Sequence, residues 1–96
     1  GNTLRAIDFR PSNGKLYALS TAPGGQYNLF TVNLQTAELT FVGGGIVGNN
    51  FGWPIRVSID FDPVRDELRV VTIGVRNNFR INANNGQLIA EETRVQ

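Results

Sequence analysis

The sequence repeats itself once, and this repeat limits the folds that the chain can adopt. Residues 7–11 (Ile-Asp-Phe-Arg-Pro) recur as residues 59–63 (Ile-Asp-Phe-Asp-Pro), and residues 28–33 recur as residues 77–82 with two Asn and one Phe in common. The spacing between matching segments is shorter toward the end of the copies, because the first copy has extra residues in the loop around Gly24. A few extra loop residues change the free energy of folding only slightly. We therefore expect two copies of one supersecondary unit.

Each copy is predicted to form four short β-strands. The apolar runs are rich in β-branched and aromatic residues and alternate with turns built from Gly, Asn and Pro, which is the pattern of an all-β fold. The expected strands cover residues 4–10, 15–21, 27–33 and 38–42 in the first copy, and residues 56–62, 67–73, 77–82 and 87–93 in the second.

The distribution of polar residues along these strands favours a β-propeller. Residues 16–19 (Leu-Tyr-Ala-Leu) are apolar on both faces, as in a strand covered from both sides, whereas the last strand carries Glu91 and Glu92. Buried inner strands and a wet outer strand are typical of a propeller blade. We expect two four-stranded antiparallel blades per chain: residues 1–43 as the first, 44–55 as a glycine-rich connection and 56–96 as the second.

Two blades alone leave apolar faces and strand edges uncovered, so a closed ring needs further blades. Three chains would close a six-bladed ring and four chains an eight-bladed ring, through head-to-tail contacts. We favour the homotrimer over the tetramer. The start at Gly1, without an initiator Met, also fits a processed or excised piece of a longer protein.

The blade motifs resemble those of a family of uncharacterised bacterial propeller-like repeats. The motifs are Ile-Asp-Phe-x-Pro, Leu-Tyr-x-Leu and Asn-Phe-Arg-Ile-Asn, and the closest stretch is residues 59–72 followed by 78–82. This resemblance spans most of the chain and implies an exported or surface-associated protein. Members of the family carry more blades in one polypeptide, which again points to assembly or truncation here. The family has no established catalytic residues, so none is implied.

Composition removes several classes of function. The chain has no Cys and no His, so a thiolate metal site, a Cys nucleophile and a His general base are all excluded. The formal net charge is +1 and the basic residues are scattered, so neither nucleic acid nor an anionic membrane is expected as a partner. No apolar stretch is long enough to span a bilayer as a helix, and no cofactor is expected.

Asp8 and Asp60 occupy the same position in the two copies and are the candidate metal ligands. In a closed ring they could line the axis and hold a hard cation such as Ca²⁺. The alternative is that each caps the turn that follows it. Asp60 and Asp62 share one face of a strand, but Arg10 replaces the second Asp in the first copy, so an ion pair between Arg10 and Asp62 competes with acid–base catalysis.

The connection between the copies holds two candidate ligand-binding aromatics, Phe51 and Trp53. On a loop rich in Gly and Asn they could stack on a sugar ring or anchor a protein partner. The alternative is that Trp53 packs under the junction between the blades. Residues 43–48 have the spacing G-x-G-x-x-G, but no helix follows to hold a pyrophosphate.

Arg69 and Arg80 lie in adjacent expected strands and are the remaining candidates for ligand binding. Together they could read an anion. The alternative is a structural ion pair with Glu67 or Asp66.

Three functions follow from these observations. The favoured one is a non-enzymatic binding or scaffold module that presents loops around a propeller axis to a glycan, a peptide or a protein. The second is a metal-dependent hydrolase or lyase that uses Asp carboxylates at the axis. The third is a self-assembling propeller fragment without a ligand. Fold alone does not choose among them.

Overall fold

The computed structural model describes residues 3–22, 24–47, 56–73 and 77–93. This part of the chain is all-β, as predicted, and no helix in it is long and apolar enough to cross a membrane. The strands of the first copy are β1 (Thr3–Phe9), β2 (Leu16–Ala22), β3 (Gln26–Val32) and β4 (Leu39–Ile46). Those of the second are β5 (Arg56–Asp62), β6 (Glu67–Ile73), β7 (Asn77–Ile81) and β8 (Leu88–Thr93).

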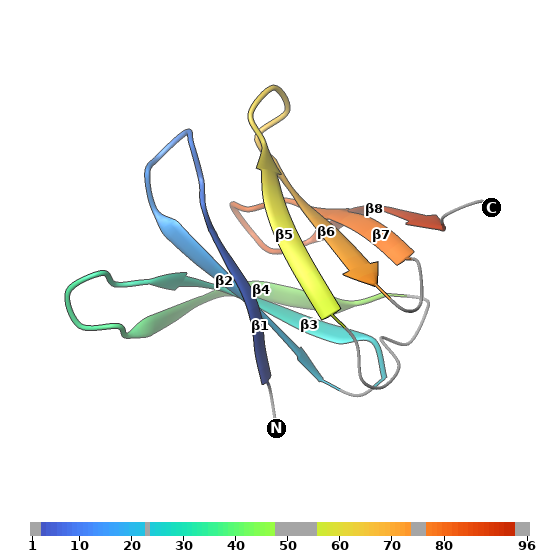
Figure 1. The fold of residues 1–96 in the computed structure, drawn as a ribbon, viewed down its shortest axis with the longest axis horizontal. Coiled ribbons are helices and arrows are strands. Elements are labelled where there is room, and N and C mark those ends of the chain that lie inside the picture. Colours follow the sequence, from blue (N-terminus) through green and yellow to red (C-terminus); the bar gives the residue numbers. More distant parts are fainter. Residues whose placement is uncertain (1–2, 23, 48–55, 74–76, 94–96) are drawn as a thin grey trace.

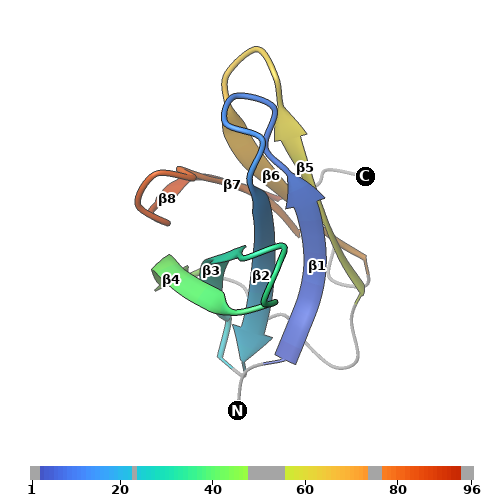
Figure 2. The same ribbon diagram turned by 90° about the vertical axis from the view of Figure 1, so that its left-hand side faces the viewer.

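The strands form two separate four-stranded sheets, each an antiparallel meander. The first sheet has the order β1-β2-β3-β4 and the second the order β5-β6-β7-β8. The innermost strands β1 and β5 lie side by side in the centre of the molecule (Figure 1). A view turned by 90° shows β1 and β5 on one side and β4 and β8 on the other (Figure 2). The two sheets therefore pack in the same orientation, with first strand beside first strand and last strand beside last strand.

One turn geometry closes both the first and the last hairpin of each sheet. In every case the fifth residue donates its N–H to the carbonyl of the first, and the fifth residue has a positive φ. Asn and Asp at the first position add side-chain bonds: Asn33 Oδ1 accepts from the Gln35 and Thr36 amides. The bonds run from Gly14 to Arg10, Ala37 to Asn33, Asp66 to Asp62 and Gly86 to Asn82, over 2.7–2.8 Å. Short polar turns thus fix the register of both sheets.

β4 is longer than its sequence predicted. It was expected to end at residue 42, with a glycine connection from residue 44, but it continues through Gly43, Gly44 and Gly45 to Ile46. Gly43 pairs with Leu29 and Gly45 with Tyr27. The segment with G-x-G-x-x-G spacing therefore begins inside strand β4. The expected end of the first blade, at residue 43, falls within this strand.

The core lies between the two sheets. Tyr17 and Phe61 make an edge-to-face contact with ring centroids 5.3 Å apart, and Tyr27 and Phe79 lie 5.5 Å apart. Such aromatic pairs add to the free energy gained by burial alone. The other buried members of this core are Leu19, Leu29, Val47, Leu68, Val70, Ile81 and Ala83.

Candidate interaction surface

A buried arginine joins the two sheets beside the first turn. The Arg10 guanidinium donates from Nε to Asp66 Oδ1 over 2.9 Å and from Nη2 to Asp66 Oδ2 over 2.6 Å. Its Nη1 donates to the Tyr17 hydroxyl over 3.1 Å. This hydrogen-bonded pair raises the pKa of Arg10 and lowers the pKa of Asp66. The predicted ion pair between sheets thus exists, but its acid is Asp66 and not Asp62.

Asp62 does not take part because its own turn uses it. Asp62 Oδ1 accepts from the amides of Val64 over 2.9 Å and Arg65 over 3.3 Å. These backbone donors, the Val64 amide first, lower the pKa of Asp62. The turn cap that the sequence suggested for Asp60 is therefore made by the next acidic residue.

Asp8, a candidate metal ligand, forms a contact between the sheets. Its Oδ2 accepts a hydrogen bond from the backbone N–H of Phe61 over 3.1 Å, so the side chain of β1 reaches the main chain of β5. Asp60, the second candidate ligand, is exposed on the far face of the second sheet. Within the described residues, no group of three or more acidic side chains could hold a metal ion.

The sheets also touch at their outer ends, where the strand glycines matter. A Cβ on Gly43 would lie 1.9 Å from the carbonyl oxygen of Asn85, and one on Gly86 would lie 2.5 Å from the Cα of Gly43. Only glycine permits so close an approach of two main chains. The Tyr27 hydroxyl donates to the Gly86 carbonyl over 2.9 Å, and burial raises the pKa of Tyr27.

Arg69 and Arg80 lie directly opposite each other on β6 and β7, as expected for adjacent strands. Arg80 Nη1 donates to Glu67 Oε1 over 2.8 Å, which is the structural ion pair that the sequence offered as the alternative. Arg69 is exposed and lies opposite Asp60 of β5. The outer face of the second sheet, with Asp60, Glu67, Arg69 and Arg80, is therefore charged.

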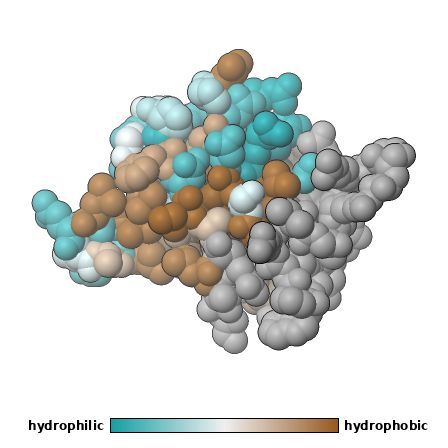
Figure 3. Space-filling model, viewed as in Figure 1, coloured by the Kyte–Doolittle hydropathy of each residue, from teal (hydrophilic) through white to brown (hydrophobic). Residues whose placement is uncertain are grey.

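The outer face of the first sheet is apolar and exposed. We call this face, formed by Ile7, Phe9, Leu39 and Phe41, the apolar face; Ile7 is 57% exposed, Phe9 53% and Phe41 60%. Figure 3 shows apolar side chains gathered over the region of the first sheet. At the position of Phe9, the second copy has Phe61, which is only 4% exposed because the first sheet covers it. Neighbouring exposed apolar side chains of this kind are typical of surfaces that bind a partner.

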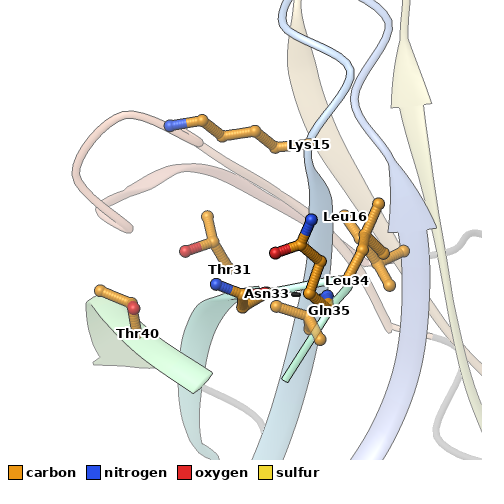
Figure 4. Close-up of a pocket in the computed structure, with 8 residues that line it drawn as sticks. Lys15, Leu16, Thr31, Asn33, Leu34, Gln35 and Thr40 are labelled. Atoms are coloured by element: carbon orange, nitrogen blue, oxygen red, sulfur yellow. Dashed lines mark hydrogen bonds between the residues drawn. The ribbon is translucent and has the colours of Figure 1, made fainter. Parts of the chain in front are cut away.

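A shallow hollow of about 390 Å³ lies at the turn end of the first sheet (Figure 4). Sequence reasoning did not find it, because its residues come from three separate segments that only the meander brings together. Asn33 cannot offer its side-chain oxygen freely, since the turn already uses it. The lining residues are Lys15, Leu16, Thr31, Val32, Asn33, Leu34, Gln35 and Thr40.

The candidate aromatics Phe51 and Trp53 lie outside the described residues. Their proposed contact with a ligand stays a prediction from the sequence.

Comparison with known proteins yields one match. A family model described as a domain of unknown function, DUF4394, matches residues 1–96. No curated protein and no solved structure matches the chain.

Proposed function

The chain belongs to this DUF4394 family, and we propose that it is a non-enzymatic binding or scaffold module whose two sheets are consecutive blades of a β-propeller. The support for blades is the way the sheets pack. The face of the first sheet that carries Tyr17 covers the face of the second that carries Phe61. The opposite face of the first sheet, which carries Phe9, is left bare. A unit that repeats in one direction and ends on a bare apolar face is suited to continue into a ring.

The exposed apolar face is the observation that carries this proposal. At the positions of Phe9 and Ile7, the second sheet has Phe61, which is buried, and Ile59, which is partly buried against the core. Leaving large apolar side chains in water forgoes roughly 25 cal/mol for each Å² that a partner would cover. We propose that further copies of the chain provide this cover and that three copies, giving six blades, close the ring in preference to four copies and eight blades.

A closed ring would present its loops to a glycan, a peptide or another protein. Propellers bind such ligands through loops at the ends of the central channel. The alternative of a metal-dependent hydrolase or lyase has less support, because the Asp8 carboxylate is already engaged by the Phe61 amide. Asp60 in turn lies opposite a cation, Arg69.

The solution mass of the chain tests this proposal. One chain has a mass of 10.5 kDa, and light scattering over a range of concentrations is expected to give three times this mass. Addition of Ca²⁺ and measurement of the melting temperature test the axial metal site in the same sample, since a ligand of the folded state raises Tm. A folded chain that stays monomeric at the highest concentration would contradict assembly.

A further inference from the structure

The junction between the two sheets contains a small motif at its inner edge. Asp8 of β1 accepts the N–H of Phe61 in β5, while Tyr17, the cross-strand partner of Asp8, packs its ring on that of Phe61. One carboxylate and one flat side chain from the first sheet therefore hold one phenylalanine of the second, by its main chain and by its ring.

The first sheet offers the receiving half of this motif a second time. Phe9 pairs with Leu16 as Phe61 pairs with Leu68, so the two phenylalanines have the same register. The amide of the following residue, Arg10, points toward the neighbouring hairpin strand and donates to Lys15 O over 2.9 Å. Because successive amides of a strand point to opposite sides, the Phe9 amide points away from β2, and the Phe9 ring is exposed.

The second sheet offers the donating half a second time. Asp60 stands at the position of Asp8, and Arg69, its cross-strand partner, stands at the position of Tyr17. Both Asp60 and Arg69 are exposed. An arginine guanidinium is planar and stacks on an aromatic ring with a cation–π attraction, so Arg69 could cover a phenylalanine ring that tyrosine contacts edge-to-face in the other junction.

We propose that the charged face of one copy docks on the apolar face of the next, with the Asp60 carboxylate accepting the N–H of Phe9 and Arg69 stacked on the Phe9 ring. This inference rests on the assembly proposed above and names its contacts. The partner is a second copy of this chain, because the two unused halves of the motif match each other and both belong to the same polypeptide.

The side chains of the charged face, the outer face of the second sheet, are compatible with burial at the junction between copies. Asp60 and Arg69, of opposite charge, occupy cross-strand positions, and Arg80 is paired with Glu67, so opposite charges are neighbours on this face. Burial of paired, hydrogen-bonded charges is tolerated, whereas burial of single ones is not. The junction between copies should be weaker than the one within the chain, because Arg69 must lose part of its hydration where Tyr17 has little to lose.

Substitution of Asp60 tests the hydrogen bond. Asp60→Ala is expected to raise the dissociation constant of the assembly about tenfold per junction, the effect of losing one bond to a charged acceptor. Glu38→Ala removes one exposed carboxylate from a turn of the first sheet and should leave the assembly unchanged. Circular dichroism and thermal melting at low concentration establish that each variant chain is folded.

A cross-linking experiment tests the direction of the contact, and the absence of cysteine from the chain makes it clean. A chain with Phe9→Cys is mixed with a chain with Asp60→Cys and treated with a short thiol-reactive cross-linker. Head-to-tail docking predicts products that contain one chain of each kind. Efficient cross-linking of the Phe9→Cys chain to itself would overturn the inference, because it requires the two apolar faces to meet.

The outcomes separate this inference from the proposed function. A monomeric native chain overturns the assembly and this inference with it. The native chain could form a trimer or tetramer whose dissociation constant changes no more with Asp60→Ala than with Glu38→Ala. That result overturns the inference alone, and the scaffold function stands.

Discussion

The two sheets have the same strand order and the same turn geometry, yet their outer faces are opposite in character. On the first sheet Ile7, Phe9 and Phe41 are exposed, and on the second the exposed side chains include Asp60 and Arg69. Between the sheets the contacts are specific: a partly buried ion pair, a carboxylate on a main-chain amide and two glycines in contact. The inner faces therefore hold the pair together, and the outer faces decide what the pair can join.

The largest expected effect comes from the glycine contact at the outer end of the junction. Gly86→Ala places a methyl group against the main chain of Gly43, so it should lower the free energy of unfolding by about 3 kcal/mol or more, through overpacking and an unfavourable positive φ. Gly14→Ala is the matched control, because Gly14 has a similar φ of 70° but open space around its Cβ. It should cost about 1–2 kcal/mol. Equal losses in urea unfolding would show that the contact is unimportant.

The next effect separates a buried arginine from an exposed one. Arg10→Met should lower the stability by about 2–3 kcal/mol, because it breaks the bidentate pair with Asp66 and removes one of the donors to the Tyr17 hydroxyl. Arg69→Met on the charged outer face should change it by less than about 0.5 kcal/mol. Urea unfolding of the monomeric chain compares the two, and a similar loss for both would contradict the assigned role of Arg10.

The same ion pair predicts how stability depends on pH. Asp66, beside Arg10, and Asp62, in its turn, both have a pKa lowered by folding. Each stabilises the fold above its unfolded pKa of about 4, and this contribution disappears as pH falls through the lower folded pKa. Stability should thus be lost on acidification below about pH 4. In Asp66→Asn the loss should be smaller, which denaturant unfolding at several pH values will measure.

A smaller effect distinguishes two aspartates that occupy equivalent positions. Asp8→Ala should lower the stability of the isolated chain by about 1.5 kcal/mol, since Phe61 loses its charged acceptor. Asp60→Ala should have almost no effect on the isolated chain, because Asp60 is exposed on the outer face. Thermal unfolding at low concentration provides the test. An equal loss of stability in both variants would mean that the hydrogen bond from Phe61 to Asp8 is not the source of the effect.

The smallest effect is a gain. Ala37 has a φ of 63° at the turn position that glycine occupies in two of the other three turns of this geometry. Ala37→Gly should raise the free energy of unfolding by about 0.5–1 kcal/mol, because glycine adopts a positive φ without strain. Ala90→Gly in strand β8 is the control and should lower it. A loss of stability in Ala37→Gly would contradict the strain at this position.

The strand pattern of this chain could be predicted from its sequence because the signals are local. Repeated apolar runs and turns with Asn, Asp and Gly predicted an all-β chain with four strands in each copy, and two four-stranded antiparallel sheets are present. The turn residues Asn33, Asp62 and Asn82 each bond to amides only two or three positions away. Interactions of such short range are visible in the sequence itself.

The junction could not be predicted, because it depends on contacts between distant residues. The glycines of β4 suggested a flexible connection, since nothing near them in sequence requires glycine. Their close contacts are distant in sequence: Gly43 meets the main chain of Asn85 and Gly86, and Gly45 meets the ring of Tyr27. Asp8 was assigned to a metal or a turn, and its partner is the amide of Phe61. Arg10 was paired with the wrong acid because Asp62, the nearer match in the repeat, is held by its own turn.

The bond from Asp8 to Phe61 also affects how the central edges behave. β1 and β5 are edge strands, and unprotected edges readily join into a continuous sheet with one another or with a foreign strand. A carboxylate that occupies an edge amide, and carries a charge there, blocks such pairing. The two sheets are then hinged between β1 and β5 by a side chain and not by a backbone ladder. The angle between the two sheets can change without the loss of a ladder bond, so in the proposed propeller one blade design could fit rings of different size.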